Sequence, residues 1–168
     1  MSGSGKHGAN RLSAYLNIHD TVMARHEASG RVEDHLEWKE EAGALVLSGW
    51  IGCRGGFRIE VWKHLRVWDR AGDTWVKTRD YAYNVTRQGR GNVLRYDSAH
   101  PHPGHENRHH VHRFDPMTGQ ELDESPLCVG EDWPTLGEVI DEVLDLAGTL
   151  GDELTDPMGF PGPPRGAG

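Results

Sequence analysis

Residues 57–68 read FRIEVWKHLRVW, and the fold can be inferred most directly from this segment. Apolar residues recur at every second position, with one exception: Phe57, Ile59, Val61, Leu65 and Val67. The positions between them are mostly polar: Arg58, Glu60, His64 and Arg66. A period of two residues is typical of a β-strand with one face on a core and the other in solvent. We therefore predict a half-buried strand in which Lys63 interrupts the apolar face.

The segments on either side carry further strand and turn signals. Residues 44–53, ALVLSGWIGC, are apolar and β-branched and end at the turn signal RGG. Residues 74–88, TWVKTRDYAYNVTRQ, follow a turn at 71–73. In this segment four apolar or aromatic residues share a parity with Lys77 and Arg79: Trp75, Tyr81, Tyr83 and Val85. We therefore expect these six side chains to point to one side of the next strand.

Two shorter strands are expected at 93–97 (VLRYD) and 109–114 (HHVHRF), after a turn at 88–92 and a Pro/Gly-rich loop. These strands follow one another without intervening helices. Parallel neighbours would need long crossover connections, so the sequence favours an antiparallel meander.

Two amphipathic helices are expected at the ends of the domain. Residues 12–28 place six residues at spacings near three and four: Leu12, Tyr15, Leu16, His19, Val22 and Met23. Near the C-terminus, Thr135 and Glu138 form a capping box. An apolar stripe follows, with acids opposite: Leu136, Val139, Ile140, Val143, Leu144, Ala147 and Leu150.

These elements predict one α+β domain over residues 11–154. It consists of a curved antiparallel sheet of about five strands with both helices packed on one face. Residues 1–10 and 155–168 are small, polar or Gly/Pro-rich, and we expect them to be disordered tails. No apolar run approaches a membrane span, and the N-terminus lacks a signal-peptide core. We expect a cytoplasmic protein with no membrane partner, and buried thiols at Cys53 and Cys128.

Charge is distributed unevenly along the 168 residues, whose formal net charge is −8. Residues 54–113 hold 12 Lys/Arg against 6 Asp/Glu, whereas residues 115–168 hold 13 acids and one base, Arg165. Such asymmetry can mark a nucleic-acid surface beside an acidic shell. It is equally compatible with ordinary solvated faces of a sheet and a helix.

Six of the eleven histidines lie within thirteen positions, 100–112. Histidine binds metals and serves as a general acid or base near neutral pH. One hypothesis is a zinc site built from the two H-x-H pairs, His100 with His102 and His110 with His112. The histidines could also be polar groups of a turn-rich connection.

A metal-independent alternative is the cleavage of RNA. This reaction needs a base for the 2′-hydroxyl proton, an acid for the leaving oxygen and a cation for the phosphorane charge. We assign His110 and His112 to the acid–base pair, with His100 and Asp97 positioning them. A basic track would bind the phosphates: Arg58, Arg66, Lys77, Arg79, Arg95 and Arg113. Exposed Trp62, Trp68 or Tyr96 would stack on bases.

The order of motifs resembles the TumE family of small proteins encoded as toxins of toxin–antitoxin pairs. That family has a Y-x-Y-like segment, then an R-[WY]-D-[NS]-A-x-H block, an HH-x-H block and a terminal helix. The matching positions span both blocks: Tyr81, Tyr83, Arg95, Tyr96, Asp97, Ser98, Ala99, His100, His109, His110 and His112. The resemblance covers about residues 44–145 and implies a bacterial toxin neutralised by a cognate antitoxin, usually a DNA-binding protein.

The function expected from the sequence is therefore a toxin that binds RNA and cleaves it as a metal-independent endoribonuclease. The alternative is a zinc-binding or protein-interaction module built on the histidine loop, without catalysis.

Overall fold

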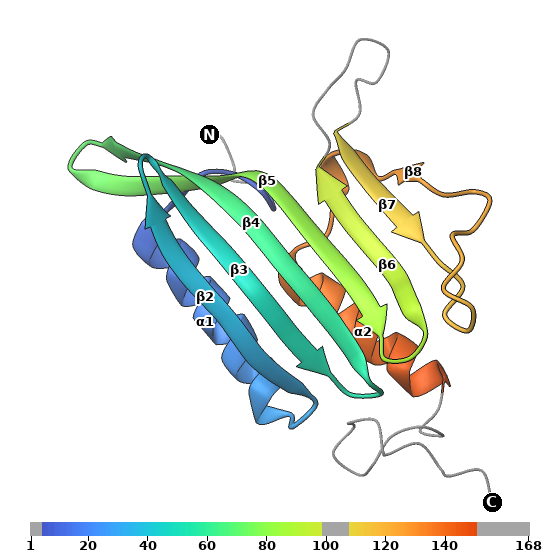
Figure 1. Ribbon diagram of the computed structural model, residues 1–168. Helices are drawn as coiled ribbons and strands as arrows, with labels where there is room; N and C mark the ends of the chain where they lie inside the picture. The colour runs from blue at the N-terminus through green and yellow to red at the C-terminus, as the bar shows by residue number, and fades with distance from the viewer. Residues whose placement is uncertain (1–4, 99–107, 151–168) are drawn as a thin grey trace, which may run out of the picture.

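The computed structural model describes residues 5–98 and 108–150, which form one sheet of eight strands and two α-helices (Figure 1). The strands are β1 (Asn10–Arg11), β2 (Val32–Glu41), β3 (Ala44–Cys53), β4 (Phe57–Arg70), β5 (Asp73–Arg87), β6 (Gly91–Ser98), β7 (His109–Arg113) and β8 (Leu127–Cys128). The helices are α1 (Leu12–Ala28) and α2 (Leu136–Leu150), with a short 3-10 helix η1 (Gly130–Asp132) between β8 and α2.

The strands run in the order β2-β3-β4-β5-β6-β7-β8, each neighbouring pair is antiparallel, and β1 pairs with β5. Figure 1 shows both helices behind the sheet, on the same side. The predicted α+β class, antiparallel meander and two helices are confirmed. The predicted strand number of about five was too low.

Strand β2 was not anticipated from the sequence, although it contains a weak alternating pattern. Only Val32, Leu36 and Trp38 supply apolar side chains on its inner side, and charged residues occupy most other positions. Strands β1 and β8 have two residues each, which is too short for any period to be visible.

A β-bulge at Arg79 turns the first part of β5 over, so the side chains before Arg79 point to the opposite faces from those expected. His64 of β4 pairs with Asp80, but the next residue, Leu65, pairs with Thr78, so Arg79 has no partner in β4. The extra residue reverses the alternation. Val76 is therefore fully buried on the helix side, whereas Lys77 points to the opposite face from Tyr81 and Tyr83.

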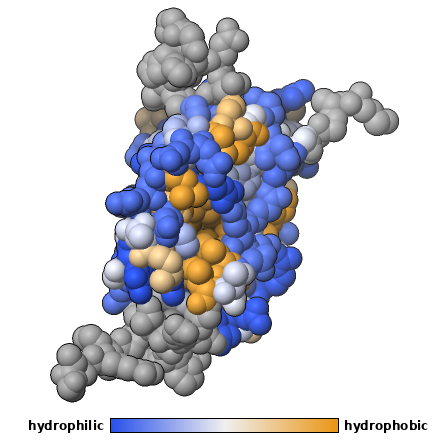
Figure 2. Space-filling model, turned by 90° about the vertical axis from the view of Figure 1, so that its right-hand side faces the viewer, coloured by the Kyte–Doolittle hydropathy of each residue, from blue (hydrophilic) through white to orange (hydrophobic). Residues whose placement is uncertain are grey.

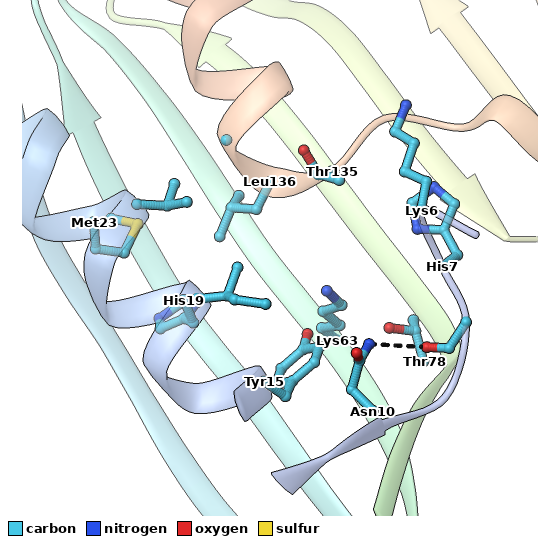
Figure 3. A pocket seen from close by; sticks show the side chains of 14 residues that line it. Lys6, His7, Asn10, Tyr15, His19, Met23, Lys63, Thr78, Thr135 and Leu136 are labelled. Carbon is cyan, nitrogen blue, oxygen red and sulfur yellow. Dashed lines mark hydrogen bonds between the residues drawn. The ribbon is translucent and has the colours of Figure 1, made fainter. Parts of the chain in front are cut away.

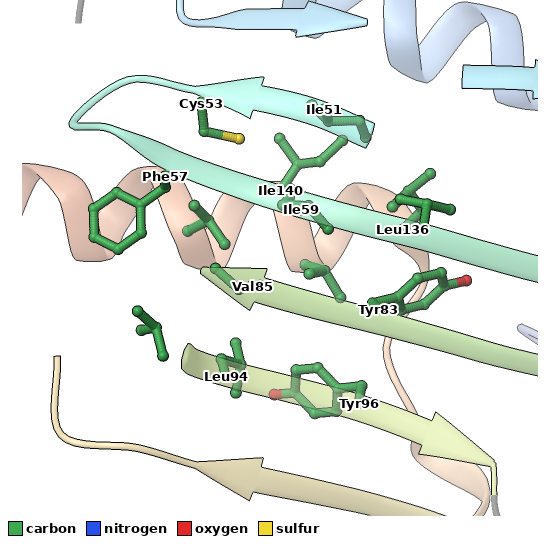
Figure 4. Packing of buried hydrophobic residues seen from close by; sticks show 14 of the residues in the cluster. Ile51, Cys53, Phe57, Ile59, Tyr83, Val85, Leu94, Tyr96, Leu136 and Ile140 are labelled. Carbon is green, nitrogen blue, oxygen red and sulfur yellow. The ribbon is translucent and has the colours of Figure 1, made fainter. Parts of the chain in front are cut away.

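The core lies between the sheet and the helices (Figure 4). Ile51, Ile59, Val85 and Leu94 of the sheet pack in one cluster with five buried residues of α2: Leu136, Val139, Ile140, Val143 and Ala147. A smaller cluster of Leu45, Leu65 and Val76 packs under α1. Burial raises the pKa of the Cys53 thiol to about 12. Cys128, in contrast, is exposed, contrary to expectation.

The N-terminal segment packs against the start of α2. The capping box is present: the Thr135 amide donates to Glu138 Oε2 at 2.8 Å, and the Glu138 amide donates to Thr135 Oγ1 at 3.2 Å. Lys6 Nζ lies 2.6 Å from Glu138 Oε2, and the His7 ring stacks on Trp133 at 3.4 Å. The ordered domain therefore begins before residue 11. The predicted C-terminal tail, 155–168, lies outside the described residues.

The edge formed by β7, β8 and the segment between them carries exposed apolar side chains. Met117, Leu122 and Leu127 are among the large exposed hydrophobic residues, and Figure 2 shows hydrophobic patches among hydrophilic ones on this side of the molecule. Within the described ranges, no helix is both long and apolar enough to span a membrane.

Candidate nucleic-acid interface

The side of the sheet opposite α1 and α2, here called the open face, displays the alternate residues of each strand. On β4 and β5 these include Arg58, Trp62, Arg66, Lys77 and Ala82. On β6 and β7 they are Arg95, Asp97, His110 and His112, which pair across the two strands: Arg95 with His112 and Asp97 with His110. The structure thus brings most of the residues expected at an RNA site to one face.

Asp97 is the centre of the most concentrated group of charges on this face. Its side chain is only 15% exposed, and Oδ2 lies 2.8 Å from Arg95 Nε. The nearest imidazole nitrogens are His110 Nδ1, 4.0 Å from Oδ1, and His112 Nε2, 3.9 Å from Oδ2. We call Arg95, Asp97, His110, His112 and Glu121 the Asp97 cluster.

Glu121 completes the cluster from the segment after β7. His112 Nδ1 donates to Glu121 Oε1 at 3.0 Å, and Ser125 Oγ donates to the same oxygen at 2.7 Å. These hydrogen bonds lower the pKa of the Glu121 carboxyl. With its Nδ1 proton held by a carboxylate, His112 has Nε2 available for proton transfer, as in other carboxylate-oriented imidazoles.

The two histidines have a spacing suited to a phosphate group. Residues two apart on one strand face are separated by about 6.6 Å along the strand. His110 and His112 therefore lie side by side along β7, His110 next to Asp97 and His112 next to Arg95 on the neighbouring strand. An acid and a base separated in this way can act on the attacking and the leaving oxygen of one phosphate.

An exposed aromatic side chain lies in the same row of paired residues. Trp62 of β4 pairs with Ala82, Ala82 pairs with Asp97, and Asp97 pairs with His110. With strands about 4.8 Å apart, Trp62 is about 10 Å from Asp97, and the small Ala82 lies between them. Trp62 is 43% exposed. A base stacked on Trp62 would therefore place its phosphate near the Asp97 cluster, and stacking contributes about 1–3 kcal/mol.

The basic track is present but interrupted. Arg58 pairs with Glu60 at 2.8 Å and lies over the Trp50 ring at 4.2 Å. Arg66 lies over the Trp68 ring at 5.5 Å, and Lys77 is exposed beside Arg66. Arg79, in the bulge, approaches Asp80 at 3.6 Å. These side chains are available to phosphates, with acids between them.

Two residues that were predicted to bind RNA, Tyr96 and Arg113, point to the helix side of the sheet. Tyr96 is 6% exposed, and its hydroxyl donates to Glu142 Oε2 of α2 at 2.9 Å, while burial raises its pKa to about 12. Arg113 Nη1 donates to Glu142 Oε1 at 3.0 Å. Both side chains connect the sheet to α2, so the expectation that they contact RNA is corrected.

Other sequence-based assignments depend on residues that are not described. His100 and His102 lie outside the described ranges, so their relation to the Asp97 cluster stays a prediction. Within residues 5–98 and 108–150, no three metal-ligating side chains are grouped as a metal site requires. Glu121 and Ser125 were missed by sequence reasoning, because they lie in an acidic connection with no local motif.

Comparisons of the chain with family models, curated proteins and solved structures gave no match. The TumE resemblance accordingly stays a hypothesis, and functional arguments depend on the site itself.

Proposed function

We propose that this protein binds single-stranded RNA on the open face and cleaves it by transesterification at the Asp97 cluster. The observation that carries the proposal is the pairing of two histidines with Asp97 and Arg95, in the same row as the exposed Trp62. Sheet surfaces with exposed aromatic side chains are a recurrent platform for single-stranded RNA.

In the proposed reaction, one histidine removes the proton from a ribose 2′-hydroxyl, whose oxygen attacks the adjacent phosphorus. The other histidine donates a proton to the departing 5′-oxygen, leaving a 2′,3′-cyclic phosphate. Arg95 stabilises the added negative charge, and Asp97 and Glu121 orient the imidazoles. The chemistry needs no metal ion.

The direct test is cleavage of a short RNA by purified protein in the presence of EDTA, compared with the same oligonucleotide carrying 2′-deoxyribose throughout. We expect cleavage of the RNA only. His110→Ala/His112→Ala should lower the rate by about 10²-fold or more, since each acid or base contributes about that factor. His35→Ala is the matched control, because His35 is an exposed histidine on β2 at the far edge of the same face.

Equal cleavage by wild type and the double variant would overturn the assignment of the histidines. Cleavage that EDTA abolishes would contradict the metal-independent reaction, whereas no cleavage together with stoichiometric metal in untagged protein would favour the zinc-binding module without catalysis.

The toxin role is a separate part of the proposal, supported by the TumE resemblance. Induced expression in a bacterial host should arrest growth and fragment RNA, and the double histidine variant should do neither at equal soluble level. Co-expression of a cognate antitoxin should restore growth. Normal growth with the wild-type protein would contradict the toxin role and leave the in vitro cleavage test unaffected.

A further inference from the structure

A cavity of about 190 Å³ lies on the helix-covered side of the sheet (Figure 3). It is bounded by α1, the segment before β1, the start of α2 and strands β4 and β5. Four apolar side chains line one part of it: Ile18, Val22, Met23 and Leu136. Polar side chains line the other: Asn10, Tyr15, Lys63 and Thr78. The cavity is on the opposite side of the sheet from the Asp97 cluster, so it is independent of the function proposed above.

Lys63 is the least expected residue in this cavity. It occupies a core-facing position of β4, between the buried Val61 and Leu65. Among the described residues, no carboxylate lies within 4.0 Å of its ammonium group, although ion pairs of that kind are present elsewhere in the same ranges. Placing an ammonium group in such a site without a counter-ion is unfavourable.

The groups next to Lys63 are phenols rather than acids. Lys63 Nζ lies 5.1 Å from the centre of the Tyr15 ring, and in Figure 3 the Tyr15 hydroxyl points toward the Lys63 ammonium. The fully buried hydroxyl of Tyr83 is the other polar neighbour of the Lys63 ammonium. The phenol oxygens of Tyr15 and Tyr83 are neutral acceptors for the Lys63 ammonium, so the polar part of the cavity holds a cation and, among the described residues, no anion.

The start of α2 adds to this electrostatic environment. Thr135, Leu136 and Gly137 line the cavity, and the N-terminus of a helix carries a partial positive charge. The capping box occupies the amides of Thr135 and Glu138. Gly137 also keeps the cavity open, because a Cβ at this position would lie only 3.0 Å from Val22 Cγ1.

We propose that this cavity binds a small monocarboxylic acid with an apolar tail. The carboxylate would lie against Lys63, Tyr15 and Thr78, and the tail would lie against Val22, Met23 and Leu136. At about 30 Å³ for each water-sized unit, the cavity holds roughly six such units. Short acids of about this volume are therefore the candidates, and we select four: butanoate, pentanoate, hexanoate and benzoate.

Isothermal titration calorimetry of the full chain with these four acids tests the proposal. We expect at least one of them to bind, whereas the matching neutral alcohols, with the same tails and no charge, should bind at least roughly tenfold more weakly, because they lack the charged hydrogen bonds. Lys63→Met should abolish binding of the acid. Lys39→Met is the matched control, since Lys39 is an exposed lysine on the opposite face of β2.

If Lys63→Met does not fold, Thr78→Val serves as the second variant, because it removes one hydroxyl at nearly constant shape. It should weaken acid binding roughly three- to tenfold. The proposal is overturned if none of the four acids binds the wild-type protein, or if the acid binds Lys63→Met as tightly as wild type. Binding of inorganic phosphate with no acid bound would also overturn it, because the apolar half of the cavity would then play no part.

Discussion

Gly49, in the middle of β3, has a φ of 128°, and a Cβ there would collide with the carbonyl oxygen of His35 in β2. Gly49→Ala should therefore lower the free energy of unfolding by about 3 kcal/mol, since both the backbone conformation and the contact oppose a side chain. Gly43→Ala is the matched control: Gly43 has a φ of 71°, but no atom lies within 4 Å of the position that an added methyl group would take. It should cost about 1 kcal/mol. Urea unfolding measures both, and equal losses would contradict the steric argument.

Buried histidines make stability depend on pH. Burial lowers the pKa of His109, which stacks on Trp133 and lies 3.1 Å from the Tyr81 hydroxyl, and burial also lowers the pKa of His7 and His19. A depressed pKa means that the unfolded chain binds more protons. Stability is therefore complete above the ordinary histidine pKa of 6.5 and is lost as the pH falls toward the folded-state values.

The melting temperature should accordingly fall between pH 7.5 and pH 5.5. His109→Phe should remove part of this fall, because phenylalanine does not titrate, while His35→Ala should leave it in place. The proton-linkage argument is wrong if His109→Phe shows the same pH dependence as wild type.

At the scale of elements, the capping box of α2 is the clearest link between sequence and structure. Thr135→Ala removes the acceptor of the Glu138 amide and should lower the free energy of unfolding by about 1 kcal/mol. Thr149→Ala, in the last turn of the same helix, removes only a bond to the Asp145 carbonyl and should cost much less. Chemical denaturation compares the two variants, and similar losses would mean that the cap adds little.

The bulge at Arg79 shows how one residue sets the orientation of a strand. Deleting Arg79 would restore simple alternation, so Lys77 and Trp75 would turn toward the helices and Val76 would leave the core. We expect the deletion to prevent folding, as judged by lost near-ultraviolet circular dichroism. Arg79→Ala, which keeps the residue count, should be close to wild type, and a folded deletion variant would contradict this account.

The sequence predicted those elements whose pattern is local and strong. Strand β4 and helix α2 have regular apolar periods, and both formed within about two residues of the expected bounds. The bulge at Arg79 could not be predicted from the sequence, because a register shift depends on how β5 pairs with the neighbouring strand β4. The same limit applied to the site: alternation placed Asp97, His110 and His112 on one face, but Glu121 reaches His112 from a separate segment through tertiary contact.

At the scale of the whole molecule, the net charge of −8 is spread over both sides of the sheet, since Glu33, Glu37 and Glu41 of β2 share the open face with its basic residues. The acidic residues of α2 lie on the helix side, where Glu142 is bound by Arg113 and Tyr96. The open face carries Arg58, Arg66, Lys77 and Arg95. RNA binding should therefore depend on the arginines and lysines of the open face alone, despite the overall negative charge.

This dependence can be measured from the effect of salt on RNA affinity. Each phosphate contact on a single strand contributes about 0.7 to the slope of log affinity against log salt concentration, because bound counter-ions are released. Arg58→Ala/Lys77→Ala should lower that slope by about 1.4. Arg113→Ala removes one positive charge from the helix side, where Glu142 already binds it, and should leave the slope unchanged well below its melting temperature. A slope that falls in Arg113→Ala by half as much as in the double variant, in proportion to the charge removed, would mean that RNA responds only to net charge and does not lie on the open face.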